Sequence, residues 1–212
     1  MSPASSISRL RHYHRKNGTH ATLWRIATAF QRAYSAGRME LYSCDLPVAD
    51  APVPLGTLER KPNAAMMKIE EKNRICSHWN PDLTRRLMEE RFAATAELWL
   101  LRWNGTIAAY GWTLRGKTIE PHYFPIEAHD THLFDFFVFP QFRGRGINPS
   151  LIWQILVEIG DDGSRRAFIE AAAWNRAQLA SLAKTPFKKL GAARKFRLGK
   201  RPLVLWSQVG LK

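Results

Sequence analysis

The sequence predicts a mixed α/β fold with a largely antiparallel sheet, and three observations carry this prediction. Asn104-Gly105 separates two strand-like runs, which is the pattern of a tight β-hairpin. An apolar strand from Leu133 to Phe139, a turn, an apolar helix and a strand from Ala167 to Trp174 form a strand–helix–strand crossover. The 212 residues, 45% of them hydrophobic, suffice for one core, so one main domain is expected.

The net charge and the cysteine content indicate which classes of partner and which compartment to expect. Lys and Arg number 32 against 18 Asp and Glu, and this net charge of +14 favours anionic partners such as RNA, acidic lipid, nucleotide cofactors or charged sugars. Two cysteines are too few for a disulfide framework, which favours a reducing compartment. The chain has neither the apolar run of a secretory signal nor a stretch that spans a bilayer. We therefore expect a cytoplasmic protein.

Residues 1–38 are expected to form a basic N-terminal arm and helix ahead of the main domain, residues 39–212. Between Thr22 and Tyr34, apolar side chains fall on one helical face and arginines lie elsewhere. This helix either packs on the domain or lies on a membrane surface, in which case residues 9–34 make a peripheral membrane contact.

The elements of the main domain follow from local signals. Asn80-Pro81-Asp82 marks a helix start, because Asn caps the first turn and Pro fits the first helical position. The first half is expected to contain a strand from Met39 to Leu46, a loop from Pro47 to Pro62, a helix near Met66 to Arg74 and a helix after Asn80. The second half is expected to contain strands Glu97–Trp103, Thr106–Arg115 and Leu133–Phe139, a helix from Pro149 to about Glu158, strand Ala167–Trp174, helix Arg176–Lys184, and a terminal pair, Ala192–Leu198 and Leu203–Trp206.

The turn Arg143-Gly144-Arg145-Gly146 joins the crossover strand to its helix. It does not fit the P-loop, which needs Gly-Lys-Ser/Thr, and the dinucleotide fingerprint needs a third glycine where this chain has Pro149. Glycines still let successive backbone N–H groups face one anion, and the helix adds its unpaired first-turn donors and the positive end of its dipole. The turn therefore suits a diphosphate, while the alternative is a plain turn with solvated arginines.

The pattern Val138-x-Pro140-x-x-Arg143-Gly144-x-Gly146-Ile147 resembles the GNAT superfamily of acyl-CoA-dependent N-acetyltransferases, whose signature is Arg/Gln-x-x-Gly-x-Gly/Ala. The resemblance covers roughly Met39 to Trp206. It implies a GNAT-like, largely antiparallel sheet with a splayed parallel strand pair, flanked by helices on both faces, and acetyl-CoA as acyl donor. Asn148 departs from the pattern, because it stands where the family has its final Gly or Ala.

The resemblance also implies which residues bind the cofactor. The strand before the turn flanks the thioester and the pantetheine arm, the turn and helix start hold the pyrophosphate, and an asparagine after the next strand contacts the arm. In this chain these residues are Phe136, Phe137, Val138, Arg143, Gly144, Arg145, Gly146, Ile147, Asn148 and Asn175.

The acceptor amine must lose a proton, and two carboxylates are candidate bases. Asp135 is the first candidate, because a carboxylate inside an apolar strand needs a reason; the alternative is that local N–H groups or an arginine satisfy it. Glu170 on the neighbouring strand is the second, and Glu120 or His122 comes after it. Many members of the superfamily place an acidic tyrosine on the last helix, where this chain has Leu182 or Phe187.

No metal site is expected, because His129-Asp130-x-His132 is too loosely spaced and no cysteine joins it. The expected function is acetyl transfer from acetyl-CoA to a primary amine, with an amino sugar or another anionic metabolite as the acceptor class. The alternative is a basic nucleic-acid- or ribosome-associated protein with a GNAT fold and little or no catalysis, which binds phosphates through Arg143, Arg145 and the C-terminal cations. The sequence does not give the oligomeric state.

Overall fold

The computed structural model describes residues 18–19, 37–77, 80–119, 122–198 and 201–209. The predicted helix from Thr22 to Tyr34 lies outside the described residues. The division into residues 1–38 and 39–212 therefore stays a prediction.

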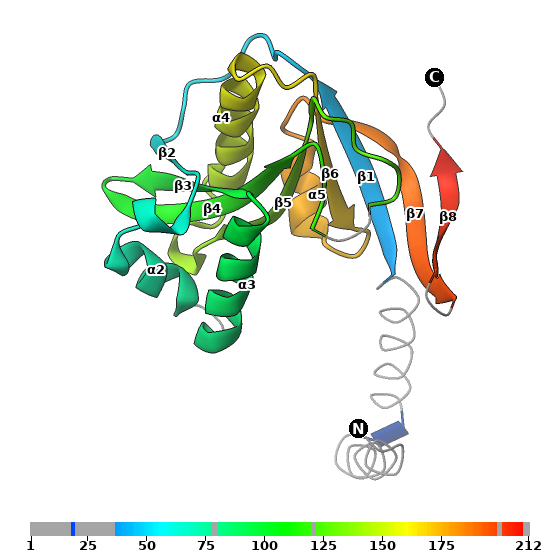
Figure 1. Cartoon of the computed structure of the whole chain (residues 1–212), viewed down its shortest axis with the longest axis horizontal. Helices are drawn as coiled ribbons and strands as arrows, with labels where there is room; N and C mark the ends of the chain where they lie inside the picture. Colours follow the sequence, from blue (N-terminus) through cyan, green and yellow to red (C-terminus); the bar gives the residue numbers. More distant parts are fainter. Residues whose placement is uncertain (1–17, 20–36, 78–79, 120–121, 199–200, 210–212) are drawn as a thin grey trace.

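Eight described strands form one mixed sheet in the order β2-β3-β4-β5-β6-β1-β7-β8 (Figure 1). Every neighbouring pair is antiparallel except β5 and β6, which run parallel. The predicted fold class is thus confirmed. The strands are β1 (Arg38–Asp45), β2 (Thr57–Lys61), β3 (Glu97–Trp103), β4 (Thr106–Arg115), β5 (Asp130–Val138), β6 (Arg166–Ala172), β7 (Lys188–Leu198) and β8 (Arg201–Val209).

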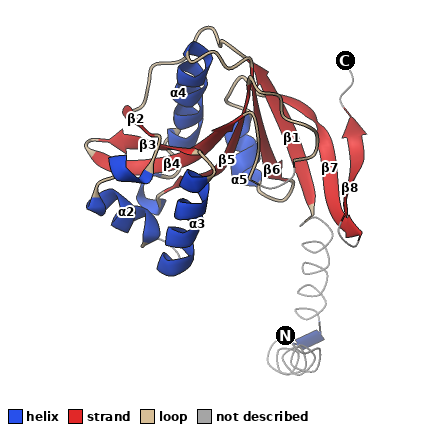
Figure 2. Ribbon diagram, in the orientation of Figure 1, coloured by secondary structure: helices blue, strands red, loops and turns tan. Residues whose placement is uncertain are grey.

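Helices cover both faces of this sheet (Figure 2). The helices are η1 (Ala64–Met66), α2 (Ile69–Cys76), α3 (Pro81–Ala93), η2 (Pro140–Phe142), α4 (Ile147–Asp161) and α5 (Arg176–Leu182). One core cluster packs α4 against the sheet, and a second cluster packs α2 and α3 against the opposite face.

Strand β3 is apolar at successive positions because both of its faces are covered. Leu98 and Leu100 belong to the cluster beneath α2 and α3, whereas Trp99 and Leu101 belong to the cluster beneath α4. Successive strand residues point to opposite faces, so a strand that is covered on both sides needs apolar residues at every position. The hairpin to β4 is confirmed, with Asn104 and Gly105 both at positive φ (47° and 75°), as a tight two-residue turn requires.

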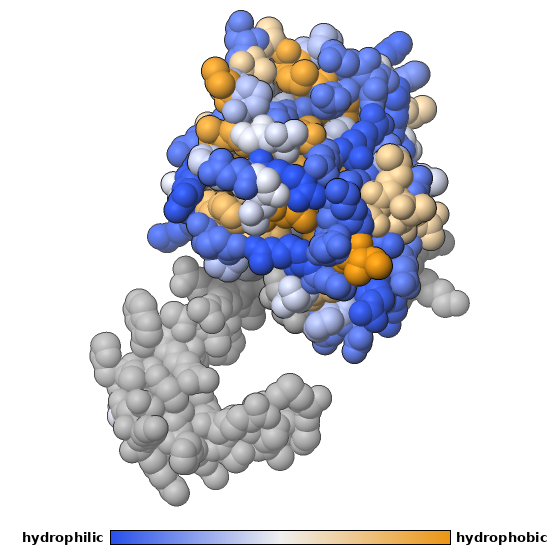
Figure 3. All heavy atoms as spheres, turned by 90° about the vertical axis from the view of Figure 1, so that its left-hand side faces the viewer, coloured by the Kyte–Doolittle hydropathy of each residue, from blue (hydrophilic) through white to orange (hydrophobic). Residues whose placement is uncertain are grey.

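The prediction of an unbroken loop from Pro47 to Pro62 is wrong, because β2 pairs antiparallel with β3 within it. This edge strand has little apolar signal and is held by ion pairs instead: Arg60 Nη2 lies 2.8 Å from Glu97 Oε1, and Arg102 Nε lies 2.7 Å from Glu59 Oε1. Charged side chains discourage further strand pairing at an edge. The surface on this side of the molecule is largely hydrophilic, with scattered apolar patches (Figure 3).

Two helix starts show how local chemistry sets the boundaries. Asn80 caps α3, since its side chain accepts a hydrogen bond of 3.1 Å from the backbone N–H of Leu83. Helix α4 begins at Ile147, two residues before the predicted Pro149, because Gly146 in the left-handed conformation (φ 74°) occupies the N-cap position.

Candidate active site

The parallel pair β5–β6 opens into a fork. The two strands are paired only from Asp130↔Arg166 to Leu133↔Ile169, and beyond Leu133 the β6 side of β5 has no strand partner. A bulge follows at once, where the register of β5 against β4 shifts and Asp135 takes a φ of 51°. Past Leu133, β5 therefore pairs with β4 but with no described strand on its other side.

A cavity of about 470 Å³ lies at this fork, walled by the end of β5, the turn into α4, the start of α4, and α5. Every residue predicted to bind the cofactor lines it except Arg145, whose side chain is exposed outside the cavity. Sequence positions from 136 to 184 therefore meet in one place.

The turn presents free backbone donors to this cavity. Gly144 and Gly146 both have positive φ (76° and 74°), a conformation that favours glycine. None of the backbone amides from Gly144 to Asn148 has a hydrogen-bond partner among the described residues, and no side chain caps α4. Free amides at a helix N-terminus form an anion site, so the turn fits a phosphate group.

The two arginines of the turn differ. Arg143 Nε donates to the Val138 carbonyl oxygen at 3.1 Å, and its guanidinium lies 5.7 Å from the centre of the Phe137 ring. Arg143 thus braces the turn against β5 while lining the cavity. Arg145 is exposed and does not line the cavity, so it would contribute long-range positive charge.

Both predicted asparagines make side-chain hydrogen bonds to helix α5. Asn148 Nδ2 donates to Ser181 Oγ (2.8 Å) and to Gln178 Oε1 (3.1 Å), which joins the start of α4 to α5. Its side-chain oxygen is buried without a partner, so a hydrogen-bond acceptor stays unused at the cavity wall. Asn175 caps α5 by accepting from the Gln178 N–H at 3.2 Å.

Leu182 and Phe187, the two positions considered for the superfamily's tyrosine, are both core residues. Leu182 is fully buried, and Phe187 is 7% exposed; both belong to the core beneath α4. Neither hydrocarbon side chain can donate a proton.

A second cavity, of about 250 Å³, lies on the α3 side of the sheet. Its walls come from α3, the segment before β5, and strands β5, β6 and β7. Phe134 and Glu170, each just past the last parallel pair, line it, so it meets the fork from the face opposite α4.

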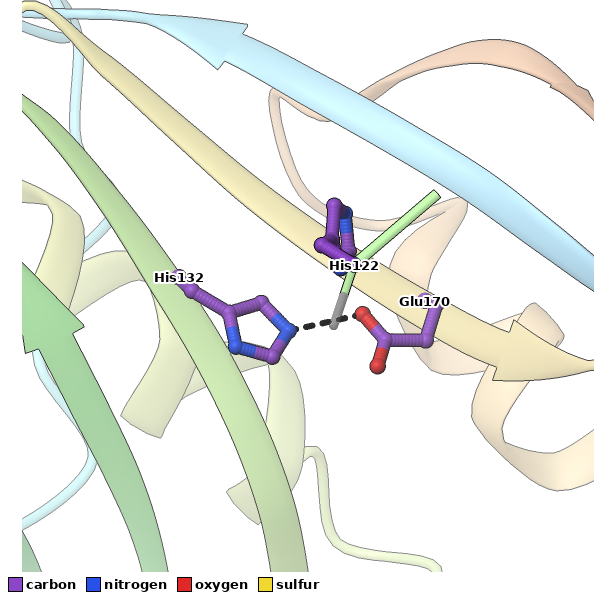
Figure 4. Close-up of side chains that lie close together, drawn as sticks. All are labelled: His122, His132 and Glu170. Atoms are coloured by element: carbon purple, nitrogen blue, oxygen red, sulfur yellow. Dashed lines mark hydrogen bonds and ion pairs between the residues drawn. The ribbon is translucent and has the colours of Figure 1, made fainter. Parts of the chain in front are cut away.

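Three titratable side chains gather in the second cavity (Figure 4). His132 of β5 is 6% exposed, and its Nε2 lies 2.8 Å from Glu170 Oε2 of β6. The His122 ring, from the segment before β5, lies 4.9 Å from the His132 ring between centroids. The other oxygen of Glu170 has no hydrogen-bond partner among the described residues.

The environment sets the charge of this cluster. Burial lowers the pKa of His122 to about 4, which keeps its imidazole neutral at neutral pH. Burial alone would raise the pKa of Glu170, but the hydrogen bond from His132 and nearby positive charge outweigh it and hold the pKa below its usual value. His132 Nδ1 is buried without a hydrogen-bond partner, whereas its Nε2 faces Glu170.

Asp135 is placed differently from Glu170. It forms an ion pair with Arg91 of α3, and its side chain is 45% exposed. The interpretation that an arginine satisfies this carboxylate, left open by the sequence, is thus realised in the structure. Of the weaker candidate bases, Glu120 lies outside the described residues, whereas His122 belongs to the cluster in the second cavity. His129, from the loosely spaced histidine motif, lies apart from the cluster, 3.4 Å from Arg115 Nη2.

The family model described as "Acetyltransferase (GNAT) family" matches residues 64–184, more than half of the chain. The chain belongs to the GNAT acetyltransferase family. A GNAT domain uses acetyl-CoA as its substrate, and the matched segment contains the fork, the turn and both cavities except Lys195.

Solved structures support the same fold. An acetyltransferase of the GNAT family from Colwellia psychrerythraea has 11% identity and a TM-score of 0.54 over 81% of this chain and 56% of that one. The tandem GNAT protein of the clavulanic acid biosynthesis pathway has 13% identity and a TM-score of 0.51 over 83% and 55%. The glucosamine N-acetyltransferase region of a fungal multi-domain β-N-acetylglucosaminidase has 12% identity and a TM-score of 0.51. The match covers 79% of this chain and 22% of that one.

These identities show a GNAT fold and not a shared substrate. The chain spans less than two thirds of the length of these three solved chains. A search of curated proteins finds no match to this chain.

Sequence reasoning missed His132 as a site residue. The signal was present in the strand period, because His132 and Phe134 alternate with core residues and so share the α3 face of β5. The parallel register that brings Glu170 beside His132 is not readable from either strand alone.

Proposed function

We propose that this protein is an acetyl-CoA-dependent N-acetyltransferase that transfers the acetyl group directly to a primary amine. The observation that carries the proposal is the meeting of two cavities at one fork of the sheet, one on the α4 side and one on the α3 side. In this proposal the first cavity holds acetyl-CoA and the second holds the amine.

Binding of acetyl-CoA is supported by the free amides from Gly144 to Asn148, which suit its pyrophosphate. The thioester would lie beside Phe136, Phe137 and Val138, where β5 has no partner on its β6 side. A backbone N–H there can donate to the oxyanion of a tetrahedral intermediate. Asn175 and the start of α5 would line the pantetheine arm.

We assign different roles to the two predicted carboxylates. Glu170 stands at the fork with one oxygen unpaired, so it would take the proton from the amine as nitrogen attacks the thioester carbonyl. Asp135 is held by Arg91, and it would keep this arginine and the bulge in place beside the reacting atoms.

The leaving group departs without an obvious acid. Collapse of the tetrahedral intermediate breaks the carbon–sulfur bond and releases the thiolate of CoA. An ordinary thiol has a pKa near roughly 8.5, so its thiolate is a tolerable leaving group at neutral pH. Loss of one acid then costs about a hundredfold in rate and leaves turnover measurable.

The acceptor class we propose is an amino sugar or another amine on an anionic metabolite. Lys195 lines the second cavity and would favour a negative group on the acceptor, while Glu170 would face its amine. The net charge of +14 favours the same class. The fungal region described as a glucosamine N-acetyltransferase shares the fold alone.

Thermal unfolding with and without acetyl-CoA tests this function. A ligand at about 100 times its dissociation constant stabilises the folded state by about 2.7 kcal/mol, so a clear rise in melting temperature is expected. Amines of several classes are then screened for release of free CoA above the rate of hydrolysis. An unchanged melting temperature, together with RNA binding that weakens steeply with salt, would favour the nucleic-acid alternative instead.

The location and the N-terminal region stay predictions. Within the described residues, no helix has the length and hydropathy needed to cross a bilayer. The cytoplasmic location and the membrane contact through residues 9–34 rest on the sequence alone.

A further inference from the structure

The cluster in the second cavity has the donor set of a metal site. His122, His132 and Glu170 each offer one ligand atom, and these atoms all lie within 4.8 Å of one another. They come from three separate parts of the chain: the segment before β5, β5 itself and β6 (Figure 4). Two histidines and one glutamate form the protein ligands of several catalytic zinc sites, which keep a fourth position open.

The geometry needs only a small adjustment. Zinc binds nitrogen and oxygen at roughly 2.0–2.2 Å, so neighbouring donors in a tetrahedral site lie roughly 3.3 Å apart. His132 Nε2 and Glu170 Oε2 are already 2.8 Å apart. The His122 ring must approach them by a rotation of its side chain, and the cavity of about 250 Å³ leaves space for water at the fourth position.

We propose that His122, His132 and Glu170 form an exchangeable site for a divalent transition metal ion of the Zn²⁺ class, and that the bound ion inhibits acetyl transfer. The inhibitory part rests on the proposed function. A metal bound to Glu170 occupies the carboxylate that takes the amine's proton, and it stands where the acceptor enters. Metal binding itself does not depend on catalysis.

Two features make the site exchangeable rather than permanent. Lys195 and Arg91 line the same cavity and repel a cation, although the charge of Arg91 is offset by Asp135. His132 Nδ1 lacks the carboxylate or carbonyl partner that orients most ligating histidines. Both features lower the affinity below that of a dedicated zinc site. The proposal departs from the expectation of no metal, which considered the sequence motif around His129 and not this cluster.

Direct titration tests the binding. The full chain, without an affinity tag and freed of metal by a chelator, is titrated with Zn²⁺ by calorimetry and with Co²⁺ by visible absorption. One saturable equivalent is expected in the wild type, with affinity reduced on the order of tenfold or more in His122→Ala and Glu170→Gln. His129→Ala is the matched control, since this exposed histidine lies in the same segment outside the cluster.

The comparison between variants removes the background from the other histidines of the seven in the chain. Circular dichroism checks that each variant is folded. Superimposable Zn²⁺ isotherms for the wild type and His122→Ala overturn the site, as does full binding by Glu170→Gln.

A separate measurement tests inhibition. Release of CoA from acetyl-CoA in the presence of an accepted amine should stop when one equivalent of Zn²⁺ is bound and resume after chelation. Unchanged turnover with the ion bound overturns the inhibitory role. If no amine releases CoA, the proposed function fails, while the titration still decides whether the metal site exists.

Discussion

Arg91 of α3 and Asp135 of β5 form an ion pair, with 2.5 Å between Arg91 Nη1 and Asp135 Oδ2. The arginine also lies over the rings of Trp112 and Phe134, at 5.2 and 5.7 Å from their centres. Helix α3 is thereby fixed to the bulge that opens the fork. One predicted carboxylate is occupied by this pair, while Glu170 keeps one oxygen unpaired.

This difference predicts unequal effects of two conservative substitutions. Glu170→Gln removes the proton acceptor and should lower kcat/KM for the amine by about a hundredfold or more, because general bases contribute about 10²–10⁴-fold. Asp135→Asn keeps its size and hydrogen-bonding shape and should cause a smaller loss. Steady-state kinetics with an accepted amine measure both.

Both variants should still be stabilised by acetyl-CoA in thermal unfolding, since neither side chain lines the first cavity. Equal losses of activity would give Asp135 a direct part in proton transfer. Full activity in Glu170→Gln would remove Glu170 from the reaction.

Substitutions at two glycines with nearly the same positive φ test the role of the turn. Gly144 (φ 76°) lies in the turn and Gly105 (φ 75°) in the hairpin, and a Cβ added at either meets nothing within 4 Å. Replacement by Ala at each should cost roughly 1 kcal/mol of stability through the positive φ alone. Only Gly144→Ala should weaken acetyl-CoA binding, as measured by calorimetry. Equal acetyl-CoA affinity in the two variants would argue against phosphate binding by the turn.

The packing of the bulge predicts a strong effect at Gly111. A Cβ at this position would lie 2.6 Å from the ring of Phe136, which lines the first cavity. Gly111→Ala should destabilise the fold by about 1–3 kcal/mol, the usual cost of overpacking, and weaken acetyl-CoA binding. Adding Phe136→Leu should recover part of the stability, which a double-mutant cycle in chemical denaturation measures. Additive losses would show that the two positions do not touch.

The two cysteines should be unreactive in the folded protein. Burial, with a contribution from the Asp45 carboxylate, raises the pKa of Cys44 to about 11, and burial also raises the pKa of Cys76. At pH 8 a thiol reagent should label neither until the chain is unfolded, which also makes such a reagent suitable for detecting free CoA. Fast labelling of the native protein would contradict this.

The same shift has a consequence for stability. An unfolded cysteine ionises near pH 8.5, whereas folded Cys44 stays protonated up to about pH 11. The unfolded state therefore loses its proton first, and the free energy of unfolding should fall as the pH rises through this interval. Denaturant titrations of the wild type and Cys44→Ala at pH 7.5 and 10 should show a smaller fall in the variant.

The sequence predicted those parts of the fold whose signals are local. Asn104-Gly105 and the glycines at 144 and 146 are residue types that adopt the positive φ values their turns require, so both turns could be predicted locally. Strand β2 was missed because an edge strand held by charges has no apolar run. The sequence left open that an arginine satisfies Asp135 but did not identify Arg91, and it missed the place of His132 beside Glu170. Both contacts depend on how distant segments align, which a single chain does not reveal.

On the proposed function, the cavities on opposite faces of the sheet would give the two reactants separate entrances. Residues of α3 and of the segment before β5 shape one entrance, whereas the turn and α5 shape the other. Neither reactant has to leave before the second arrives. Substitutions around the α3 entrance should therefore change which amine is accepted without changing the affinity for acetyl-CoA.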